Sequence, residues 1–561
     1  MQDQSIHVSG ARAPTRRALL ATAVTAAAGL ALGTSAAGGA RSASGPAGPR
    51  TTLPAAVVTN KVYTVSTRNT STSSTYPRTE FRGLWTASVL NIDWPSRTGL
   101  SVAAQQTELR SILNLAVSRN LNAVFLQVRP AADRMWSSTL GEPWSRYLTG
   151  TQGTHPGYDP LAYAVEQAHS RGLALHAWVN PFRVSMDANL TSLVASHPAR
   201  LNPTWSFAYG GRRYYNPGIP AVRAFVRAVV VDLVRRYDVD GVHFDDYFYP
   251  YPVAGQALPD AAAFAAYGGG YTSIANWRRN NINVFVRDTY AAIKAARRRA
   301  AFGISPFGIW LNATSSALGS ATSGLESYSA LYADSRKWVK EGWVDYILPQ
   351  LYWYQGYPPA DYDVLVAWWA RQVAGTRVKL YTGEAAYRVG DPAQPAWQDP
   401  NELRDHITKG RSVPGVAGQA FYNTTAFRAN PLNAIGILAA RHYARPALPV
   451  PLPHLVSARP WTPLIRSASW YGSGILLTWE AKSGAEPPTH IAIWRWESSG
   501  AAVPNIQSTA TYLRAVRRRT GLTQSWRDTG VVRGRTYWYL IQSVSQTGID
   551  SGNATCVFVR A

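Results

Sequence analysis

The chain has 561 residues, of which 46% are hydrophobic and 12% aromatic, and its formal net charge is +24. This length predicts roughly two to four domains with large cores, and the single cysteine, Cys556, excludes both an intramolecular disulfide and a cysteine-based metal cluster. The basic residues are scattered apart from two short arginine clusters, and no nucleic-acid-binding motif accompanies them. We therefore expect a solvated basic surface that favours anionic cell-wall polymers, and no nucleic-acid partner.

Residues 1–43 have the order of regions found in a secretory signal. The pair Arg16-Arg17 is followed by an alanine-rich apolar run to about Leu32 and then by small residues. The arginine pair indicates the twin-arginine export route, with cleavage between Ser35 and Ala43. Because the apolar run is too short for a stable membrane span, we expect a secreted, extracellular or wall-associated mature protein without one.

An alternation of short strands and helices is expected for residues 79–445, after a flexible Ser/Thr/Pro-rich spacer at residues 44–78. Strands this short and apolar are typical of parallel strands that are buried on both faces. The crossovers between them predict the α/β class and a closed (β/α)₈ TIM barrel. The eight expected strands are Gly83–Val89, Ala123–Arg129, Ala174–Asn180, Gly241–Asp245, Ala301–Pro306, Asp345–Tyr352, Val378–Glu384 and Gly415–Tyr422.

A second domain is expected at residues 455–561, after a stiff Pro-rich linker at residues 446–454. Its short alternating strands predict a small all-β immunoglobulin-like sandwich. The segment resembles a fibronectin type III domain through Leu477-Thr-Trp479, Asp528-Thr-Gly530 and Tyr537-Trp-Tyr539.

The segment Val239–Pro252 begins as a short buried strand and ends in two adjacent carboxylates among aromatic rings. Side chains alternate along a strand, so Gly241, His243 and Asp245 share one face. In a barrel of this kind the active site lies at the C-terminal ends of the strands, which places Asp245 and Asp246 at the site. The alternative is that these carboxylates cap a loop or pair with arginines.

The same alternation predicts that polar side chains from several strands converge at one end of the barrel. Buried polar groups are costly without partners, so a large converging set favours a site over separate core hydrogen bonds. The set comprises Gln127, Arg129 and Asp133 from the second strand, His176, Trp178, Asn180 and Arg183 from the third, His243 and Asp245 from the fourth, Gln350, Tyr352 and Trp353 from the sixth, and Glu384 from the seventh.

Paired carboxylates beside stacking aromatic rings suit glycoside hydrolysis. We predict that Asp245 is the central catalytic carboxylate and that Asp246 and Glu384 compete for the acid/base role. The predicted substrate-binding residues are Tyr247, Tyr249, Tyr352 and Trp353 on sugar faces, Arg129, Asn180 and Arg183 on hydroxyl, acetamido or carboxylate groups, and Asp133, His176, His243 and Gln350 around them.

Two other functional classes remain open. His176, His243 and Asp245 could bind the metal of a barrel deacetylase or amidohydrolase, although the first strand has no His-x-His pair. A catalytically silent, glycan-binding wall protein is the second alternative. The preferred interpretation needs no metal and no cofactor.

The barrel also resembles glycosyl hydrolase-like family 10, bacterial proteins related to those said to cleave peptidoglycan glycan strands. The resemblance implies a (β/α)₈ hydrolase that acts on glycans with N-acetylated sugars. The fourth strand is similar, in addition, to that of α-amylase-type barrels, in which the residue matching Asp245 is the nucleophile, and to that of chitinase-type barrels, whose acid Glu would fall on Tyr247. Glu384 lies in no matched motif. The stretches that match family 10 are Phe81–Trp85, Asn122–Pro130, His176–Arg183, Asp240–Pro250, Phe302–Pro306 and Val344–Trp353.

Overall fold

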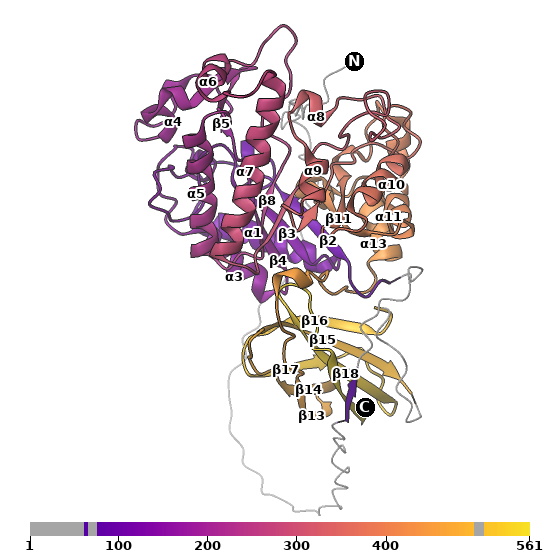
Figure 1. Cartoon of the computed structure of the whole chain (residues 1–561). Coiled ribbons are helices and arrows are strands. Elements are labelled where there is room, and N and C mark those ends of the chain that lie inside the picture. Colours follow the sequence, from indigo (N-terminus) through magenta and orange to yellow (C-terminus); the bar gives the residue numbers. More distant parts are fainter. Residues whose placement is uncertain (1–60, 65–75, 499–509) are drawn as a thin grey trace, which may run out of the picture. The chain divides into compact units, whose positions relative to one another are not determined.

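The computed structural model describes residues 61–64, 76–498 and 510–561 (Figure 1). The predicted signal and most of the predicted spacer lie outside these residues. Within the spacer, Lys61–Thr64 forms strand β1, which pairs antiparallel with β19 (Asn553–Arg560), so this part is not a free linker. Its β-branched and aromatic residues favour a strand, but four residues are too few to stand out in a Ser/Thr-rich stretch. Among the described residues, no helix is long and apolar enough to cross a membrane.

Eight parallel strands close into a barrel in the order β10-β11-β12-β2-β3-β4-β8-β9, which confirms the predicted fold. Sequential neighbours pair in register: Ala123 of β3 lies opposite both Gly83 of β2 and Ala174 of β4. The strands are β2 (Phe81–Thr86), β3 (Ala123–Arg129), β4 (Ala174–Val179), β8 (Gly241–Phe244), β9 (Ala301–Ile304), β10 (Tyr346–Ile347), β11 (Lys379–Ala385) and β12 (Val416–Tyr422).

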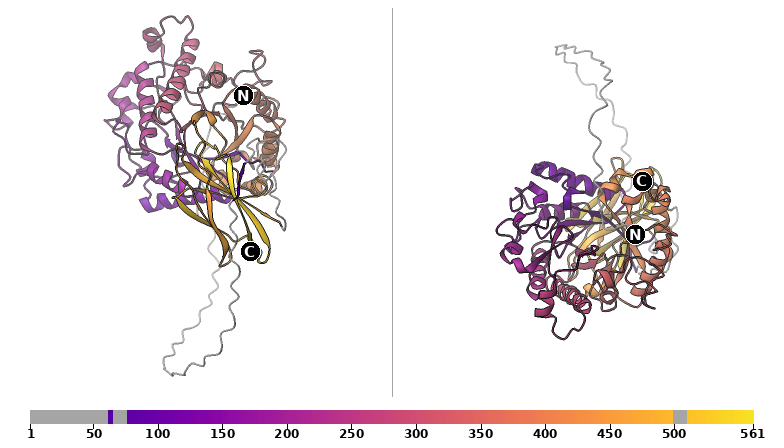
Figure 2. Two further views of the ribbon diagram at one scale, coloured as in Figure 1. Left: turned by 60° about the horizontal axis from the view of Figure 1, so that its bottom comes forward. Right: turned by 90° about the horizontal axis from the view of Figure 1, so that it is seen from above.

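Helices follow each strand and surround the barrel in the view from above (Figure 2). The Ser101 hydroxyl caps the first of them by accepting from the Ala104 backbone N–H. Pro220 is the first residue of the helix that leads into β8, the fourth barrel strand. The longer helices are α1 (Val102–Ser118), α3 (Pro160–Ser170), α5 (Pro220–Arg236), α7 (Ile274–Ala296), α10 (Tyr362–Val373), α11 (Glu402–Ser412) and α13 (Ala434–His442); the shorter are α2 (Arg146–Thr149), α4 (Pro198–Leu201), α6 (Ala261–Tyr267), α8 (Ser327–Ala330), α9 (Ser335–Lys340) and α12 (Thr424–Ala429).

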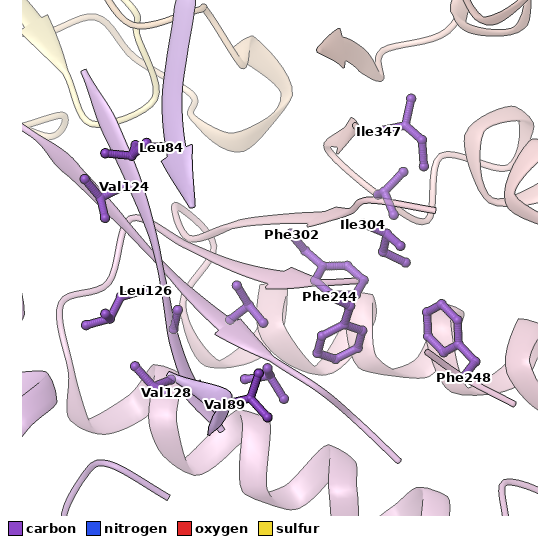
Figure 3. Close-up of a cluster of buried hydrophobic side chains, with 14 of the residues drawn as sticks. Leu84, Val89, Val124, Leu126, Val128, Phe244, Phe248, Phe302, Ile304 and Ile347 are labelled. Carbon is purple, nitrogen blue, oxygen red and sulfur yellow. The ribbon is translucent and has the colours of Figure 1, made fainter. Parts of the chain in front are cut away.

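The main hydrophobic core lies between the strands and the helices (Figure 3). Leu84, Val124, Leu126, Phe244 and Phe302 belong to this layer and are almost fully buried. Because side chains alternate along each strand, the residues between them face the barrel interior.

A second cluster fills that interior, with Phe81, Phe125 and Tyr346 among its members. Two glycines make room for it. A Cβ on Gly241 would lie 2.5 Å from His176 Nδ1, and one on Gly303 would lie 2.0 Å from the Tyr346 ring. These positions therefore accept no side chain while the interior keeps this packing.

Two antiparallel sheets form the C-terminal part, as predicted. One has the order β13-β14-β17 and the other β1-β19-β18-β15-β16, and Cys556 is buried on β19. The two sheets share a core that includes Trp479 and Tyr539. The other strands of these two sheets are β13 (Leu464–Tyr471), β14 (Gly474–Glu480), β15 (Pro488–Glu497), β16 (Leu513–Arg518), β17 (Thr523–Asp528) and β18 (Thr536–Ser545). A small antiparallel sheet between β4 and α5 has the order β5-β7-β6 and consists of β5 (Arg183–Ser185), β6 (Ser206–Tyr209) and β7 (Arg212–Tyr215).

The segment predicted as a stiff linker, residues 446–454, is packed rather than exposed. Leu448, Val450 and Leu452 are buried, and the latter two join the interior cluster that contains Phe81 and Tyr346. The alternation of proline with apolar residues, which indicated stiffness, places Val450 and Leu452 on the barrel, whereas Leu448 belongs to a cluster with Trp494 and Trp538.

Candidate active site

Asp245 and Asp246 follow β8, and each side chain is 4% exposed. Asp245 shares the inward face of β8 with His243, as alternation predicts, and it contacts the inward-facing residues of the neighbouring strand β4. The structure therefore brings the predicted central carboxylate to the C-terminal mouth of the barrel.

One oxygen of Asp245 accepts two N–H donors. Trp178 Nε1 donates to Oδ2 at 3.2 Å, and the Asn180 side-chain amide donates to the same atom. The side-chain oxygen of Asn180, Oδ1, accepts from Gln127 Nε2 at 2.6 Å and from an Arg183 guanidinium nitrogen at 2.7 Å. These two donors fix the orientation of the Asn180 amide, so its NH₂ group must point at Asp245.

Asp246 is held by a different set of groups. The Tyr251 hydroxyl donates to Oδ2, and Gln350 Nε2 donates to Oδ1 at 3.0 Å. Gln350 Nε2 also lies 3.0 Å from the Ser305 carbonyl oxygen, so three strand ends are joined at this point. The predicted contact of Gln350 with the site is therefore made through Asp246.

The two carboxyl groups titrate together. Burial raises the pKa of Asp245 to about 7, with a further contribution from the Asp246 charge, while Arg183 opposes the shift. Burial also raises the pKa of Asp246, against hydrogen bonds from Tyr251 and Gln350. Two buried carboxylates this close do not both ionise readily, so the pair retains one proton near neutral pH.

Aromatic rings surround the pair. The Arg183 guanidinium lies 5.4 Å from the centroid of the half-buried Tyr247 ring. Tyr352 and Tyr422 have centroids 6.2 Å apart at an interplanar angle of 26°, and Tyr387, which is 42% exposed, meets both edge-on. Tyr247 and Tyr352 were predicted as sugar platforms, and the structure places the rings of Tyr387 and Tyr422 beside that of Tyr352.

Four of these residues were absent from the predicted binding set, although the sequence offered signals for three. Trp178 shares a face with Asn180, Tyr422 ends the last expected strand, and Tyr251 belongs to the aromatic run after Asp246. Tyr387 follows β11 in a short 3₁₀ turn, for which no pattern in the sequence gave a signal.

His176 and His243 lie deeper in the barrel, away from the carboxylate pair. Trp85 Nε1 donates to His243 Nε2 at 3.2 Å, which leaves the proton of this imidazole on Nδ1. His243 Nδ1 then donates to the Tyr346 hydroxyl at 3.1 Å, and that hydroxyl donates to His176 Nδ1 at 3.0 Å. Burial lowers the pKa of His176 to about 4 and that of His243 well below its usual value.

This hydrogen-bonded chain corrects the predicted substrate contacts of both histidines, because their ring nitrogens serve the barrel interior. It also bears on the metal alternative. Across residues 76–498 and 510–561, no group of three or more His, Cys, Asp or Glu side chains is arranged to hold a metal ion.

Arg129 differs from its predicted role. It is fully buried and forms a bidentate ion pair with Glu142, at 2.8 and 2.5 Å. Its other terminal nitrogen donates to the backbone carbonyl oxygens of Asn180, at 2.5 Å, and Pro181, at 3.1 Å. Arg129 therefore positions the backbone of Asn180 and does not face a sugar.

Glu384 is not brought to the carboxylate pair, which corrects its predicted acid/base role. Tyr381 faces the barrel interior, so Glu384, three residues later, faces the helices. There it is fully buried and accepts from Tyr362 at 2.8 Å and Thr382 at 2.5 Å, with His406 Nδ1 at 2.8 Å. Although burial opposes a charge on His406, hydrogen bonds to Glu384 and Glu402 raise the pKa of His406 to about 9.

The remaining predicted residues do not face the carboxylate pair as sugar contacts. Tyr249 is fully buried with its ring edge-on to Tyr332, centroids 5.3 Å apart, so it offers no face to a sugar. Trp353 is 8% exposed and packs edge-on against Phe307, with centroids 5.5 Å apart, so it anchors the loop after β10 and presents no open sugar platform. Asp133 lines a separate cavity, described below.

Known proteins resemble this chain over a stretch that includes the barrel. Residues 80–399 match the family model described as Glycosyl hydrolase-like 10. Glycosyl hydrolase YngK of Bacillus subtilis (strain 168) is 41% identical over 478 residues, which cover 84% of this chain and 92% of that protein. Glycosyl hydrolase DigH of Escherichia coli (strain K12) is 38% identical over 373 residues, covering 63% of this chain and 83% of that protein.

Among solved structures, the glycoside hydrolase domain of PgaB (BpsB) from Bordetella bronchiseptica aligns with a TM-score of 0.43 at 15% identity, over 65% of this chain and 99% of that chain. The family match and the identity to YngK confirm the prediction drawn from the motifs: the chain belongs to the glycosyl hydrolase-like 10 family and is a glycoside hydrolase by class.

Proposed function

We propose that the protein is an exported glycoside hydrolase that cleaves glycosidic bonds in the glycan strands of cell-wall peptidoglycan. The observation that carries this proposal is the buried pair Asp245–Asp246 at the mouth of the barrel, where burial raises the pKa of both carboxyl groups. Glycoside hydrolysis needs one carboxylic acid and one carboxylate at the scissile bond, and this pair supplies both.

In this mechanism the protonated carboxyl group gives its proton to the glycosidic oxygen as the bond to the anomeric carbon breaks. The ionised partner supports the positive charge that develops on the sugar, and water completes the hydrolysis. Trp178 and Asn180 position Asp245, whereas Tyr251 and Gln350 position Asp246. The surrounding tyrosines offer ring faces for sugar stacking.

The choice of peptidoglycan rests on the family resemblance of the motifs and on charge. A net charge of +24 favours association with polyanionic wall material. The twin-arginine pattern in residues 1–43 supports action outside the cytoplasm.

For the C-terminal sheets we infer a fibronectin type III-like module. Support comes from the sequence likeness and from a sandwich in which β13, β14 and β17 face β15, β16, β18 and β19. Such a module would act as an accessory to the hydrolase barrel.

The test is incubation of the mature protein with purified peptidoglycan, with glycan strands stripped of their peptides, and with unrelated polysaccharides. The expected result is new reducing ends from the first two, and none with Asp245→Asn. Release of free acetate without new reducing ends would instead indicate a deacetylase. Equal binding by both proteins with no products of either kind would indicate a glycan-binding protein.

A further inference from the structure

A cavity of about 190 Å³ lies among the loops that follow β2, β3 and β4. Asp133 stands in its wall, together with Leu90, Val184 and Met186. The mechanism proposed above uses none of these residues. The cavity therefore needs its own explanation.

Asp133 is the unusual member of this wall. Its side chain is 1% exposed, and neither carboxyl oxygen has a hydrogen-bond partner of normal geometry. The Ser145 hydroxyl and the Arg146 backbone N–H lie near enough to lower its pKa, yet burial dominates and raises it to about 7. A buried carboxyl group without partners is costly, which is the expected condition of a group whose partner arrives with a ligand.

Strained backbone surrounds the same cavity. Leu90 has φ 53° and is 53% exposed, and Ala132, directly before Asp133, has φ 47°. Residues with a side chain rarely adopt this left-handed conformation, which costs energy unless the surroundings enforce it. Such strain gathers at ligand sites, and an exposed leucine at the rim offers an apolar surface to a ligand.

The short strand β5 (Arg183–Ser185) connects the wall of the cavity to the residues that position the catalytic pair. Arg183, at its start, donates to the Asn180 amide that orients Asp245, and the next two residues line the cavity. Arg183 Nε also donates to the Pro130 carbonyl oxygen at 2.9 Å, and Ala131 lines the cavity wall. The wall of the cavity is thus tied to the side chains that position Asp245.

We propose that this cavity is a sugar subsite that takes a neighbouring 2-acetamido sugar of the bound glycan strand, with Asp133 hydrogen-bonded to its acetamido group. The apolar wall formed by Leu90, Val184 and Met186 suits the acetamido methyl group and the C–H face of the ring, and Asp133 supplies the polar contact. This inference rests on the proposed function.

The test measures binding by calorimetry in the full chain carrying Asp245→Asn, so that oligosaccharides stay intact. The ligands are chitin oligosaccharides from disaccharide to hexasaccharide and the N-deacetylated hexasaccharide. Met186→Trp fills the cavity without changing charge, Asp133→Asn alters the polar contact, and Val117→Trp, at a 42% exposed position on α1, is the matched control.

We expect Met186→Trp and Asp133→Asn to weaken hexasaccharide binding about tenfold, the scale of one buried hydrogen bond to a charged group, while disaccharide binding and the control stay unchanged. The affinity lost when the hexasaccharide is N-deacetylated should be smaller in the protein that also carries Met186→Trp than in the protein that carries Asp245→Asn alone. Unchanged hexasaccharide affinity in both variants would overturn the inference, as would equal losses at every length together with a lower Tm. If wild-type protein cleaves glycan strands in those cases, the proposed function survives; if it neither binds nor cleaves any, both fail.

Discussion

Two groups of polar side chains on the inward face of the same barrel behave in opposite ways. His243 and Asp245 lie two residues apart on β8 and at its end. The histidine is neutral and its nitrogens are engaged with Trp85 and Tyr346, deep in the interior. The aspartate adjoins a second carboxylate, and its pKa is raised to about 7. A spacing of two residues thus separates a structural hydrogen-bond network from a reactive carboxylate pair. Substitutions in the network should therefore change mainly the stability of the protein, and substitutions in the pair mainly its kcat.

The largest effect on kcat is expected from changes to the carboxylate pair at the mouth of the barrel. Asp245→Asn or Asp246→Asn removes one of the two carboxyl groups that share a proton, so kcat should fall by between about 10² and 10⁴-fold. The Tm should stay the same or rise, because burial opposes the charge of each group. Reducing-end release from glycan strands, measured beside thermal unfolding, checks both statements.

An Asp246→Asn protein that kept wild-type kcat would contradict the proposal that Asp245 and Asp246 together supply the acid and the carboxylate. In that case the acid would have to come from another residue or from water. The single variants also serve as the inactive background for the binding measurements above.

The buried Glu384–His406–Glu402 network should give the next largest effect, and it acts on stability. The pKa of His406 is raised to about 9 from an ordinary 6.5, so its contribution is complete below about pH 6.5 and is lost as the pH rises through 9. The shift corresponds to about 3 kcal/mol. Urea unfolding across this pH range should show the decline in wild-type protein.

His406→Gln is the control, since it lacks the titrating group and should lose this part of the pH dependence. At neutral pH it should also be less stable, because two buried glutamates lose their cation. Its kcat per folded molecule should stay near that of wild type. A large loss of kcat without loss of stability would return Glu384 to the acid/base role.

A smaller loss of stability is expected from Tyr346→Phe in the interior. The change removes the hydroxyl that joins His176 to His243 and leaves two buried ring nitrogens without their partner. We expect the free energy of unfolding to fall by about 1–3 kcal/mol, with kcat nearly unchanged at temperatures well below the transition. An activity loss at unchanged stability would instead place this network in the catalytic machinery.

Sequence patterns predict the barrel well because each strand is short, apolar and followed by a helix with its own start signal. They also place Asp245, because polar residues mark the inward face of β4 and β8. On β11 the same reasoning fails: strands buried on both faces are apolar on both sides, so nothing in the sequence shows that Tyr381 faces inward and Glu384 outward.

The partner of Arg129 was equally hidden. Glu142 lies 13 residues away in a loop, and a loop's path cannot be read from periodicity. The sequence showed that Arg129 is near the strand end, but only the structure shows that its guanidinium is occupied. Candidate site residues at strand ends therefore divide into those whose partners are fixed locally and those whose partners come from loops.

The smallest predicted effect concerns the proton shared by the pair. Activity should follow a bell-shaped pH profile, since the pair must lose one proton to form the carboxylate and must keep the other as the acid. The Tyr251 hydroxyl donates to Asp246 and lowers the pKa of that carboxyl group. In Tyr251→Phe this donor is gone, so the lower limb of kcat/KM should move to higher pH by about one unit, while the plateau near neutral pH changes little.

Tyr387→Phe is the matched control, because the Tyr387 ring packs against Tyr352 and Tyr422 near the pair but its hydroxyl is not among the main groups that shift the pKa of either carboxyl. Its lower limb should stay where the wild-type limb lies. If both variants shift the profile alike, the effect comes from the aromatic wall and not from the proton on the pair. If only the upper limb moves in Tyr251→Phe, the two carboxyl groups titrate in the reverse order, with Asp246 holding the proton that the leaving oxygen receives.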